Sequence, residues 1–510
     1  MNNIKMRGYQ KKQVNFIVQN SNKPLISLQS PTGSGKSFVM FQAIKTMLEK
    51  DKGRQFAIVT GFNNLVYQLE QSAMEFGFKP TVLMSIKKSH CLLKAKGTKA
   101  FYQNINPNVF PDTWDCKNCE HRKENAVPCL YDEAIYQSVK SQLIITNHAY
   151  FLSHQKYFCN RYIFFDECHV FPDFYQSYMS AEITIDTLVN IYCKSTEAYK
   201  SGIRVKSDSK FSPAVLKSQV KKKNVTPVAI DKCLQLLNDP EFIPAELDKK
   251  SESEFEDTEL EVRKMLAMEE GDKTDFFKEN EVNVKGDFIG LKYTKFFDKI
   301  DLDIDFNGCL VSATVDDYTK SVFDVNCNYV EENCNIIDYT KSAIYLKEDF
   351  SEEGLTEILQ NEKGKHGLFL STQLSLVDKY KNSQIAGFSF TTKGFSPDKK
   401  QVLIGSKKLF QGIDIEGVDF VILNKIPFDP YNECSKAFNK YLTKNGRNPW
   451  NYYTIPHTEN TITQAIGRLW RKKGDKGNIY IFDKRAKMKF FYMIRDCADY
   501  RKGINVVNDD

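Results

Sequence analysis

Residues 29–37, near the start of the chain, have the types and spacing that bind a polyphosphate; they read QSPTGSGKS. Gly33 and Gly35 allow the backbone to approach a phosphate chain closely, so that the N–H groups of the loop can meet its charge. Lys36 is expected to reach the β- and γ-phosphates, and the hydroxyl of Ser37 to hold Mg²⁺. The sequence therefore predicts a nucleoside triphosphate site here.

The segments on either side of this loop have the patterns that such a site requires. Residues 25–28 form a short apolar run that predicts a buried strand, and apolar residues recur at helical spacing from Val39 to Leu48. Strand, glycine-containing loop and helix form the context of a P-loop. Ser30 stands where the usual pattern has its first glycine. A glycine-rich turn before an ordinary helix is the alternative interpretation.

A second chemical element follows another apolar run, residues 162–165, which ends in Asp166 and Glu167. Asp166 is expected to hold Mg²⁺ through its shell, and Glu167 to orient and deprotonate the water that attacks the γ-phosphate. A helix cap is the alternative role for such a pair. Because a P-loop strand precedes it, the pair favours hydrolysis of the nucleotide.

Late in the chain, Gln464, Gly467, Arg468 and Arg471 recur at i, i+3, i+4 and i+7, which places them on one face of a predicted helix. Two guanidiniums and an amide suit a surface that meets a γ-phosphate across a cleft, because each arginine can bind two phosphate oxygens. Arg468 and Arg471 are therefore candidate arginine fingers from a second lobe. A solvated helical face is the alternative.

Four cysteines gather in one segment that lacks the strand and helix alternation around it. Cys91, Cys116, Cys119 and Cys129 are separated by 24, 2 and 9 residues. Such a cluster predicts a closed thiolate site. Thiolate ligation suits tetrahedral Zn²⁺ or a [4Fe–4S] cluster, and the spacing alone does not separate them; unliganded thiols are the third alternative.

Composition limits the class of protein. The 510 residues are enough for two to four domains, and 41% hydrophobic with 27% charged residues is a globular composition. A net charge of +6 permits a polyanionic partner without requiring one. No apolar run reaches the roughly 18 residues of a membrane span. The thirteen cysteines and the absence of a signal-peptide pattern predict a reducing compartment, the cytoplasm.

The pattern along the chain predicts an α/β fold of two lobes with two insertions. Alternating strands and helices assign residues 1–84, 136–180 and 298–330 to lobe 1 and residues 331–510 to lobe 2. The cysteine segment, residues 85–135, interrupts lobe 1. Residues 181–297 interrupt it again with a charged region that we predict to be mainly helical.

These motifs together resemble the superfamily 2 helicases. Asp166-Glu167-Cys168-His169 is similar to their DEAH/DECH box, and Ser312-Ala313-Thr314 matches the S-A-T of motif III. Residues 411–417, followed by Pro427-Phe428, resemble motif V of the XPD/DinG branch, and residues 464–471 match Q-x-x-G-R-x-x-R of motif VI. Gln411 departs from the glutamate that is common in that branch.

The resemblance implies roles for individual residues. It implies two RecA-like lobes, with Arg7 and Gln10 recognising adenine and Thr60 touching the nucleic-acid backbone. The predicted ATP and Mg²⁺ contacts are Arg7, Gln10, Gly33, Ser34, Gly35, Lys36, Ser37 and Asp166, and the predicted catalytic residues are Lys36, Glu167, Gln464, Arg468 and Arg471. The residues placed as DNA contacts or couplers are Thr60, His169, Thr314, Gly412 and Asp414.

The position of the cysteines, between motifs Ia and II, is where XPD/DinG-like helicases carry a four-cysteine iron–sulfur domain. The resemblance thus favours the [4Fe–4S] cluster, with Zn²⁺ as the alternative. The second insertion, residues 181–297, corresponds in position to an arch over the DNA path. The first insertion and this arch would together form a pore that separates a duplex.

The implied function is an ATP-dependent helicase, a monomer that moves 5′→3′ on single-stranded DNA and opens duplex junctions, with RNA as a further substrate and no membrane partner. One alternative is a translocase that strips proteins or remodels RNA and R-loops without strand separation. Another is a zinc-containing adaptor that binds nucleic acid under nucleotide control. Glu167 and Arg468 argue against the adaptor, because a clamp that does not hydrolyse ATP needs neither residue.

Overall fold

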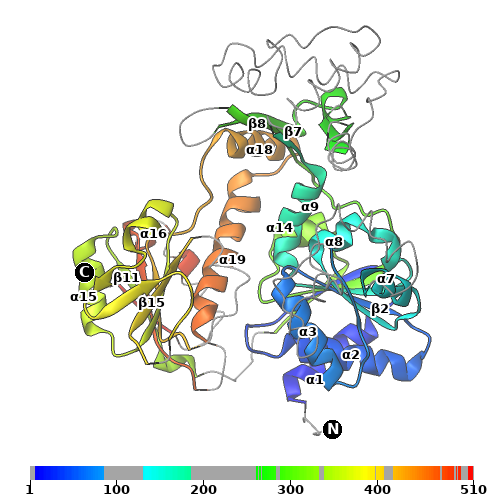
Figure 1. Ribbon diagram of the computed structural model, residues 1–510, viewed down its shortest axis with the longest axis horizontal. Coiled ribbons are helices and arrows are strands. Elements are labelled where there is room, and N and C mark those ends of the chain that lie inside the picture. Colours follow the sequence, from blue (N-terminus) through cyan, green and yellow to red (C-terminus); the bar gives the residue numbers. More distant parts are fainter. Residues whose placement is uncertain are drawn as a thin grey trace, which may run out of the picture.

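The computed structural model describes residues 6–85, 130–184, 260–331, 338–406, 417–470 and 474–508, with short gaps at 262, 266, 283–287, 397, 488–489, 491 and 495–503. Two sheets with flanking helices form two lobes that stand side by side, and a smaller antiparallel sheet lies above them (Figure 1). No helix in these ranges is long and apolar enough to cross a membrane.

Lobe 1 is built on a seven-stranded parallel sheet in the order β10-β1-β9-β5-β2-β4-β3. Its strands are β1 (Leu25–Gln29), β2 (Phe56–Thr60), β3 (Thr81–Leu83), β4 (Leu143–Asn147), β5 (Tyr162–Asp166), β9 (Asn307–Ser312) and β10 (Cys327–Val330). Its helices include α1 (Gly8–Gln19), α2 (Lys36–Lys50), α3 (Asn63–Glu75), α7 (Leu130–Lys140), α8 (His148–Ser153), α9 (Phe171–Met179) and α14 (Asp317–Val322).

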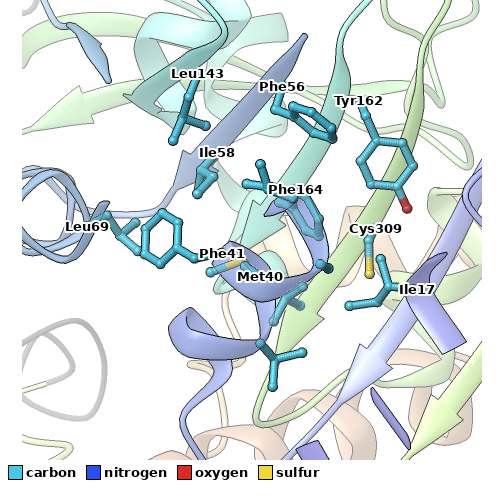
Figure 2. Close-up of a cluster of buried hydrophobic side chains, with 14 of the residues drawn as sticks. Ile17, Met40, Phe41, Phe56, Ile58, Leu69, Leu143, Tyr162, Phe164 and Cys309 are labelled. Carbon is cyan, nitrogen blue, oxygen red and sulfur yellow. The ribbon is translucent and has the colours of Figure 1, made fainter. Parts of the chain in front are cut away.

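Both faces of the lobe 1 sheet are buried, as is usual for a parallel sheet. Because side chains alternate along a strand, Phe56 and Ile58 of β2 pack with helix α2, whereas Ala57 and Val59 belong to the opposite apolar cluster. Figure 2 shows Phe56 and Ile58 in the same cluster as Phe41 of α2. The two clusters hold the strands in one rigid layer whose carboxyl edge carries the candidate site.

Lobe 2 is an eight-stranded sheet in the order β13-β14-β15-β12-β16-β17-β11-β18, parallel except for the β13–β14 pair. The strands are β11 (Ala343–Lys347), β12 (His366–Leu370), β13 (Gln384–Ile385), β14 (Phe388–Thr391), β15 (Gln401–Gly405), β16 (Phe420–Leu423), β17 (Asn478–Phe482) and β18 (Asn505–Asn508). Its helices include α15 (Glu352–Asn361), α16 (Leu374–Tyr380), α18 (Glu433–Lys444), α19 (Ile455–Ile466) and α20 (Lys484–Lys487).

The described ends of the second insertion form a third sheet, which the prediction of a mainly helical segment did not include. Strands β6 (Ala181–Thr184), β7 (Phe276–Val282) and β8 (Phe288–Lys295) form an antiparallel sheet at the two ends of that segment. The buried and exposed residues of β6 alternate, which is the strand period. Charged residues on the solvent side obscured this period in the sequence. Residues 185–259, the bulk of the segment, lie outside the described residues.

Candidate nucleotide site between the lobes

The carboxyl ends of four neighbouring strands bring the predicted motifs of lobe 1 together. Strand β1 leads into the P-loop, and β9, β5 and β2 end at Ser312, Asp166 and Thr60. Loops at this edge of a parallel sheet are the usual place for a ligand. Ser30 N–H donates to Ser312 O at 3.0 Å, so the P-loop starts directly beside motif III.

The P-loop depends on its two glycines. Gly33 and Gly35 have φ of 76° and 84°, the left-handed region that glycine enters without strain. A Cβ on Gly35 would also lie 2.8 Å from Gln10 Nε2. Helix α2 starts at Lys36, whose Nζ donates to Ser30 O at 3.4 Å. The N-terminus of this helix and the lysine therefore lie at the same loop.

Ser30, the departure from the usual glycine, is fully buried and hydrogen bonded. Its hydroxyl donates to Ser34 Oγ at 2.8 Å and accepts from Gln13 Nε2 at 3.0 Å. The serine thus ties the two ends of the loop to each other and to helix α1. Sequence reasoning missed Gln13, although its spacing of i+3 from Gln10 on a helix was a signal for a shared face.

The start of α1 braces the same loop. Gln10 Nε2 and the hydroxyl of Tyr9 each donate to Ser34 O at 3.0 Å, and Gln10 Oε1 accepts from the backbone N–H of Arg7 at 3.0 Å. Gln10 is only 7% exposed. In the structure its amide supports the P-loop; the predicted adenine contact of Arg7 and Gln10 stays a prediction.

Asp166 lies buried at the end of β5 with an unusual ionisation. Burial, and next the nearby Glu167 carboxylate, raise the pKa of Asp166 to about 7, against the opposing effect of the Lys36 charge. A bound divalent cation would lower the pKa of Asp166 again, because it stabilises the carboxylate form. The crowding of two carboxylates beside the P-loop lysine therefore fits the predicted Mg²⁺, with Asp166 and the Ser37 hydroxyl as the residues that would hold it.

The structure gives Thr60 a partner that the sequence analysis did not predict. Its side chain is fully buried, and its hydroxyl donates to Asp166 Oδ2 at 3.1 Å. A buried hydroxyl that donates to Asp166 is turned away from a nucleic acid bound at the surface. The reason is the strand order: β2 is next to β5, so the ends of the two strands face each other. Thr60 orients the Asp166 carboxylate.

Glu167 and His169 form the next part of the site. Glu167 has φ of 51°, a left-handed conformation that is strained for a residue other than glycine. His169 Nδ1 lies 2.8 Å from Ser312 Oγ and 3.4 Å from Glu167 Oε2. Burial lowers the pKa of His169, which favours its neutral form. The ring thus joins the Glu167 carboxylate to motif III.

Motif III in turn contacts lobe 2. The Ser312 hydroxyl accepts from the backbone N–H of Thr314 at 3.2 Å, and Gln464 Nε2 of α19 donates to Thr314 Oγ1 at 3.2 Å. A chain of polar contacts therefore runs from Glu167 through His169, Ser312 and Thr314 to Gln464, across the boundary between the lobes. Figure 1 shows α19 on the side of lobe 2 that faces lobe 1.

A second contact across the boundary was not predicted. Asn460 Nδ2, one helical turn before Gln464, donates to Asp316 Oδ2, while Asp316 Oδ1 caps α14 by accepting from Thr319 N–H. Tyr318 of α14 also packs edge-to-face on Tyr453, in the π-helical turn (Trp450–Thr454) that precedes α19. Asn460 and Asp316 are 144 residues apart, so no local sequence pattern indicates this contact.

The motif VI residues do not all share one regular helix. Helix α19 ends at Ile466, and Gly467–Leu469 forms a 3-10 turn, so the predicted i to i+7 row is interrupted at Gly467. Arg468 is 8% exposed in this turn. Arg471 lies outside the described residues.

Two further groups of predicted residues also lie outside the described residues. They are the motif V residues Gly412 and Asp414, and the cysteines Cys91, Cys116, Cys119 and Cys129. The absence of a metal-binding cluster among the described residues therefore says nothing about the four cysteines.

The fold and the site define a protein of two α/β lobes with a P-loop in the first lobe. Family models match both lobes: residues 3–190 match the model described as "Type III restriction enzyme, res subunit", and residues 343–492 match "Helicase C-terminal domain". A solved structure named XPD helicase has a TM-score of 0.64 at 16% identity, with 99% of this chain and 100% of that chain covered.

Curated relatives point to one branch. The chain is 34% identical over 98 residues to the 3'-5' exonuclease DinG of Bacillus subtilis and 31% identical over 90 residues to the ATP-dependent DNA helicase DinG of Photobacterium profundum. The matched segments are 19% and 17% of this chain, and 10% and 13% of those relatives. Together, the two family models and these relatives support a superfamily 2 helicase similar to XPD and DinG.

Proposed function

We propose that the chain is an ATP-dependent DNA helicase that moves along single-stranded DNA and separates duplexes. The observation that supports this most directly is the polar chain from Glu167 to Gln464. It joins the carboxylate beside the P-loop to the motif VI helix of the other lobe, which is the connection a motor needs. The relatives named as ATP-dependent DNA helicases support the same activity.

In the proposed reaction, the P-loop and Lys36 hold the phosphates of ATP, and Glu167 orients the attacking water and takes its proton. Asp166 and Ser37 would hold Mg²⁺, which neutralises charge on the β- and γ-phosphates. Arg468 and Arg471 approach the γ-phosphate from lobe 2. Cleavage and phosphate release remove the charge that draws the lobes together.

Strand separation is proposed to depend on the two insertions of lobe 1. We assign a [4Fe–4S] cluster to Cys91, Cys116, Cys119 and Cys129, with Zn²⁺ as the alternative, and an arch to residues 181–297. Movement is proposed to run 5′→3′, with Gly412 and Asp414 of motif V among the residues that follow the strand. This assignment rests on the family resemblance and on the position of the cysteines between motifs Ia and II.

The first test is steady-state ATP hydrolysis with and without single-stranded DNA. Lys36→Ala is expected to abolish stimulated turnover, because the variant loses the charge at the phosphates. Lys45→Ala is the matched control, since Lys45 is exposed on the same helix. Turnover that persists in Lys36→Ala would refute the P-loop assignment.

The second test uses DNA and RNA duplexes that carry a 5′ or a 3′ single-stranded tail. Separation of the 5′-tailed DNA duplex alone is the expected result. Stimulated ATP hydrolysis without displacement of any strand would favour the translocase instead. A protein with no steady-state turnover at all would be the nucleotide-controlled adaptor.

A further inference from the structure

An open groove of about 860 Å³ lies where the insertion of lobe 1 meets lobe 2. One wall comes from β7 and the residues before it, and the other from helix α18 and the loop before it. Figure 1 shows β7 and α18 next to each other above the gap between the lobes. The side chains that matter here are Lys273, Phe276, Lys278, Tyr431, Lys436 and Lys440.

The groove carries an excess of positive charge. Its lining has four lysines against two glutamates, Glu269 and Glu433, a balance of +2. Lys273 and Lys278 share the single carboxylate of Glu269. Burial raises the pKa of Glu269, but hydrogen bonds from Lys273 and Tyr293 outweigh this effect and bring it to about 2, so the count holds at neutral pH.

An exposed aromatic ring stands in the same groove. Tyr431 is 75% exposed, and Lys436 Nζ lies 5.6 Å from the centre of its ring. Lys436 also pairs with Glu433, three residues away, at 2.6 Å. An exposed ring with lysines beside it offers a base a stacking surface and its phosphate a charge, the combination found where proteins hold single strands.

Packing between α18 and the end of β8 fixes the two walls of the groove to each other. Phe296, which follows β8, is 2% exposed and lies 5.2 Å from Phe438 and 5.6 Å from Tyr441 of α18, ring centre to ring centre. Lys444 at the end of α18 pairs with Asp272 before β7. The walls are therefore held together before any ligand binds, which reduces the ordering cost of binding.

We propose that this groove binds a single-stranded nucleic acid, with one base stacked on Tyr431 and the adjoining phosphates beside Lys436 and Lys440. The proposal rests on the function proposed above and specifies where the strand lies beyond the helicase motifs of the two lobes. Because the groove joins the lobe 1 insertion to lobe 2, a strand held there would connect the arch to the moving lobe.

The first experiment measures the affinity of the full chain for a fluorescein-labelled 20-nucleotide oligo(dT), without nucleotide, by fluorescence anisotropy. Tyr431→Ala is expected to weaken binding about 5- to 150-fold, the range for one lost stacking partner. Tyr431→Phe keeps the ring and should bind like wild type. Tyr136→Ala is the control, because Tyr136 is 63% exposed and has Lys140 Nζ 5.1 Å from its ring centre.

The second experiment measures the salt dependence of the same binding. Each lost phosphate contact to a single strand lowers the slope of log Kd against log salt by about 0.7, so the double variant Lys436→Ala/Lys440→Ala should lower it by about 1.4. Lys381→Ala is the control: like Lys436 it pairs with a carboxylate three residues away, at 2.6 Å from Asp378, but outside the groove lining. A merely structural role of the lysines would leave the slope unchanged.

The outcomes separate this proposal from the proposed function. If Tyr431→Ala and the double lysine variant bind oligo(dT) with unchanged affinity and slope while the wild type shows DNA-stimulated ATP hydrolysis, the groove proposal is overturned and the function stands. This is the result expected if the groove binds an acidic protein segment instead of a nucleic acid. If the wild type neither binds oligo(dT) nor is stimulated by it, both fail. Folding of each variant is checked by its basal ATP hydrolysis.

Discussion

The contact between Gln464 and Thr314 allows a quantitative test of how the two lobes communicate. Thr314→Val keeps the shape of the side chain but removes the hydroxyl, and Gln464→Met keeps its length but removes the amide. Each change eliminates the 3.2 Å hydrogen bond between the lobes. The backbone bond of Thr314 to Ser312 remains in Thr314→Val, because it uses the N–H group.

The expected size of the effect follows from the geometry. A neutral hydrogen bond at a site like this one, where Thr314 is 5% exposed, contributes about 1 kcal/mol. If the contact aligns motif VI during turnover, each single variant should lower DNA-stimulated kcat roughly fivefold. The double variant should lose no more than about fivefold, because the same bond is lost only once. Independent effects would multiply to about 25-fold.

The assay is steady-state ATP hydrolysis at saturating ATP and single-stranded DNA. Thr314→Ser keeps a hydroxyl and serves as the control, with kcat expected within about twofold of wild type. A double variant whose loss equals the product of the single losses would refute the argument, since it would mean that the two side chains act separately. The Asn460 to Asp316 contact should keep α19 in place in every variant.

Two further predictions concern the metals. The pKa of Asp166 is raised to about 7, so Mg²⁺ must displace a proton from this carboxyl group at lower pH. The additional thermal stabilisation by Mg²⁺ over ADP alone should therefore be larger at pH 8 than at pH 6. The Mg²⁺ affinity should fall about tenfold per pH unit well below pH 7, and Asp166→Asn should remove this dependence. Cys116→Ser should abolish the visible absorption of protein purified without oxygen while ATP binding survives, and anaerobic wild-type protein that contains only zinc would contradict the cluster.

The parts of the site that the sequence predicts are those whose signal is local. The P-loop is one continuous segment, and its strand, glycines and helix start all lie within residues 25–36. Asp166 follows directly on an apolar strand, and parallel strands end at a common edge. The apolar pattern and the geometry of a parallel sheet therefore predict that Asp166 and Lys36 lie at the same edge of the sheet.

The parts that the sequence did not predict depend on partners far along the chain. Thr60 and Asp166 are 106 residues apart, and their hydrogen bond follows from the pairing of β2 with β5, which no local pattern specifies. The strands of the second insertion were hidden for another reason. In β7 and β8, lysines and glutamates interrupt the apolar pattern, so composition suggested a charged helical region.

Ser30 combines a local sequence signal with contacts that only the fold provides. Read locally, a serine at the first glycine position weakens the P-loop pattern, because the side chain needs space that glycine leaves empty. In the structure the hydroxyl is buried between Gln13 and Ser34 and bonded to both. The loop therefore tolerates the serine because Gln13 of α1, 17 residues before it, supplies an amide at the right place. A departure from a motif is informative only together with the residues that pack against it.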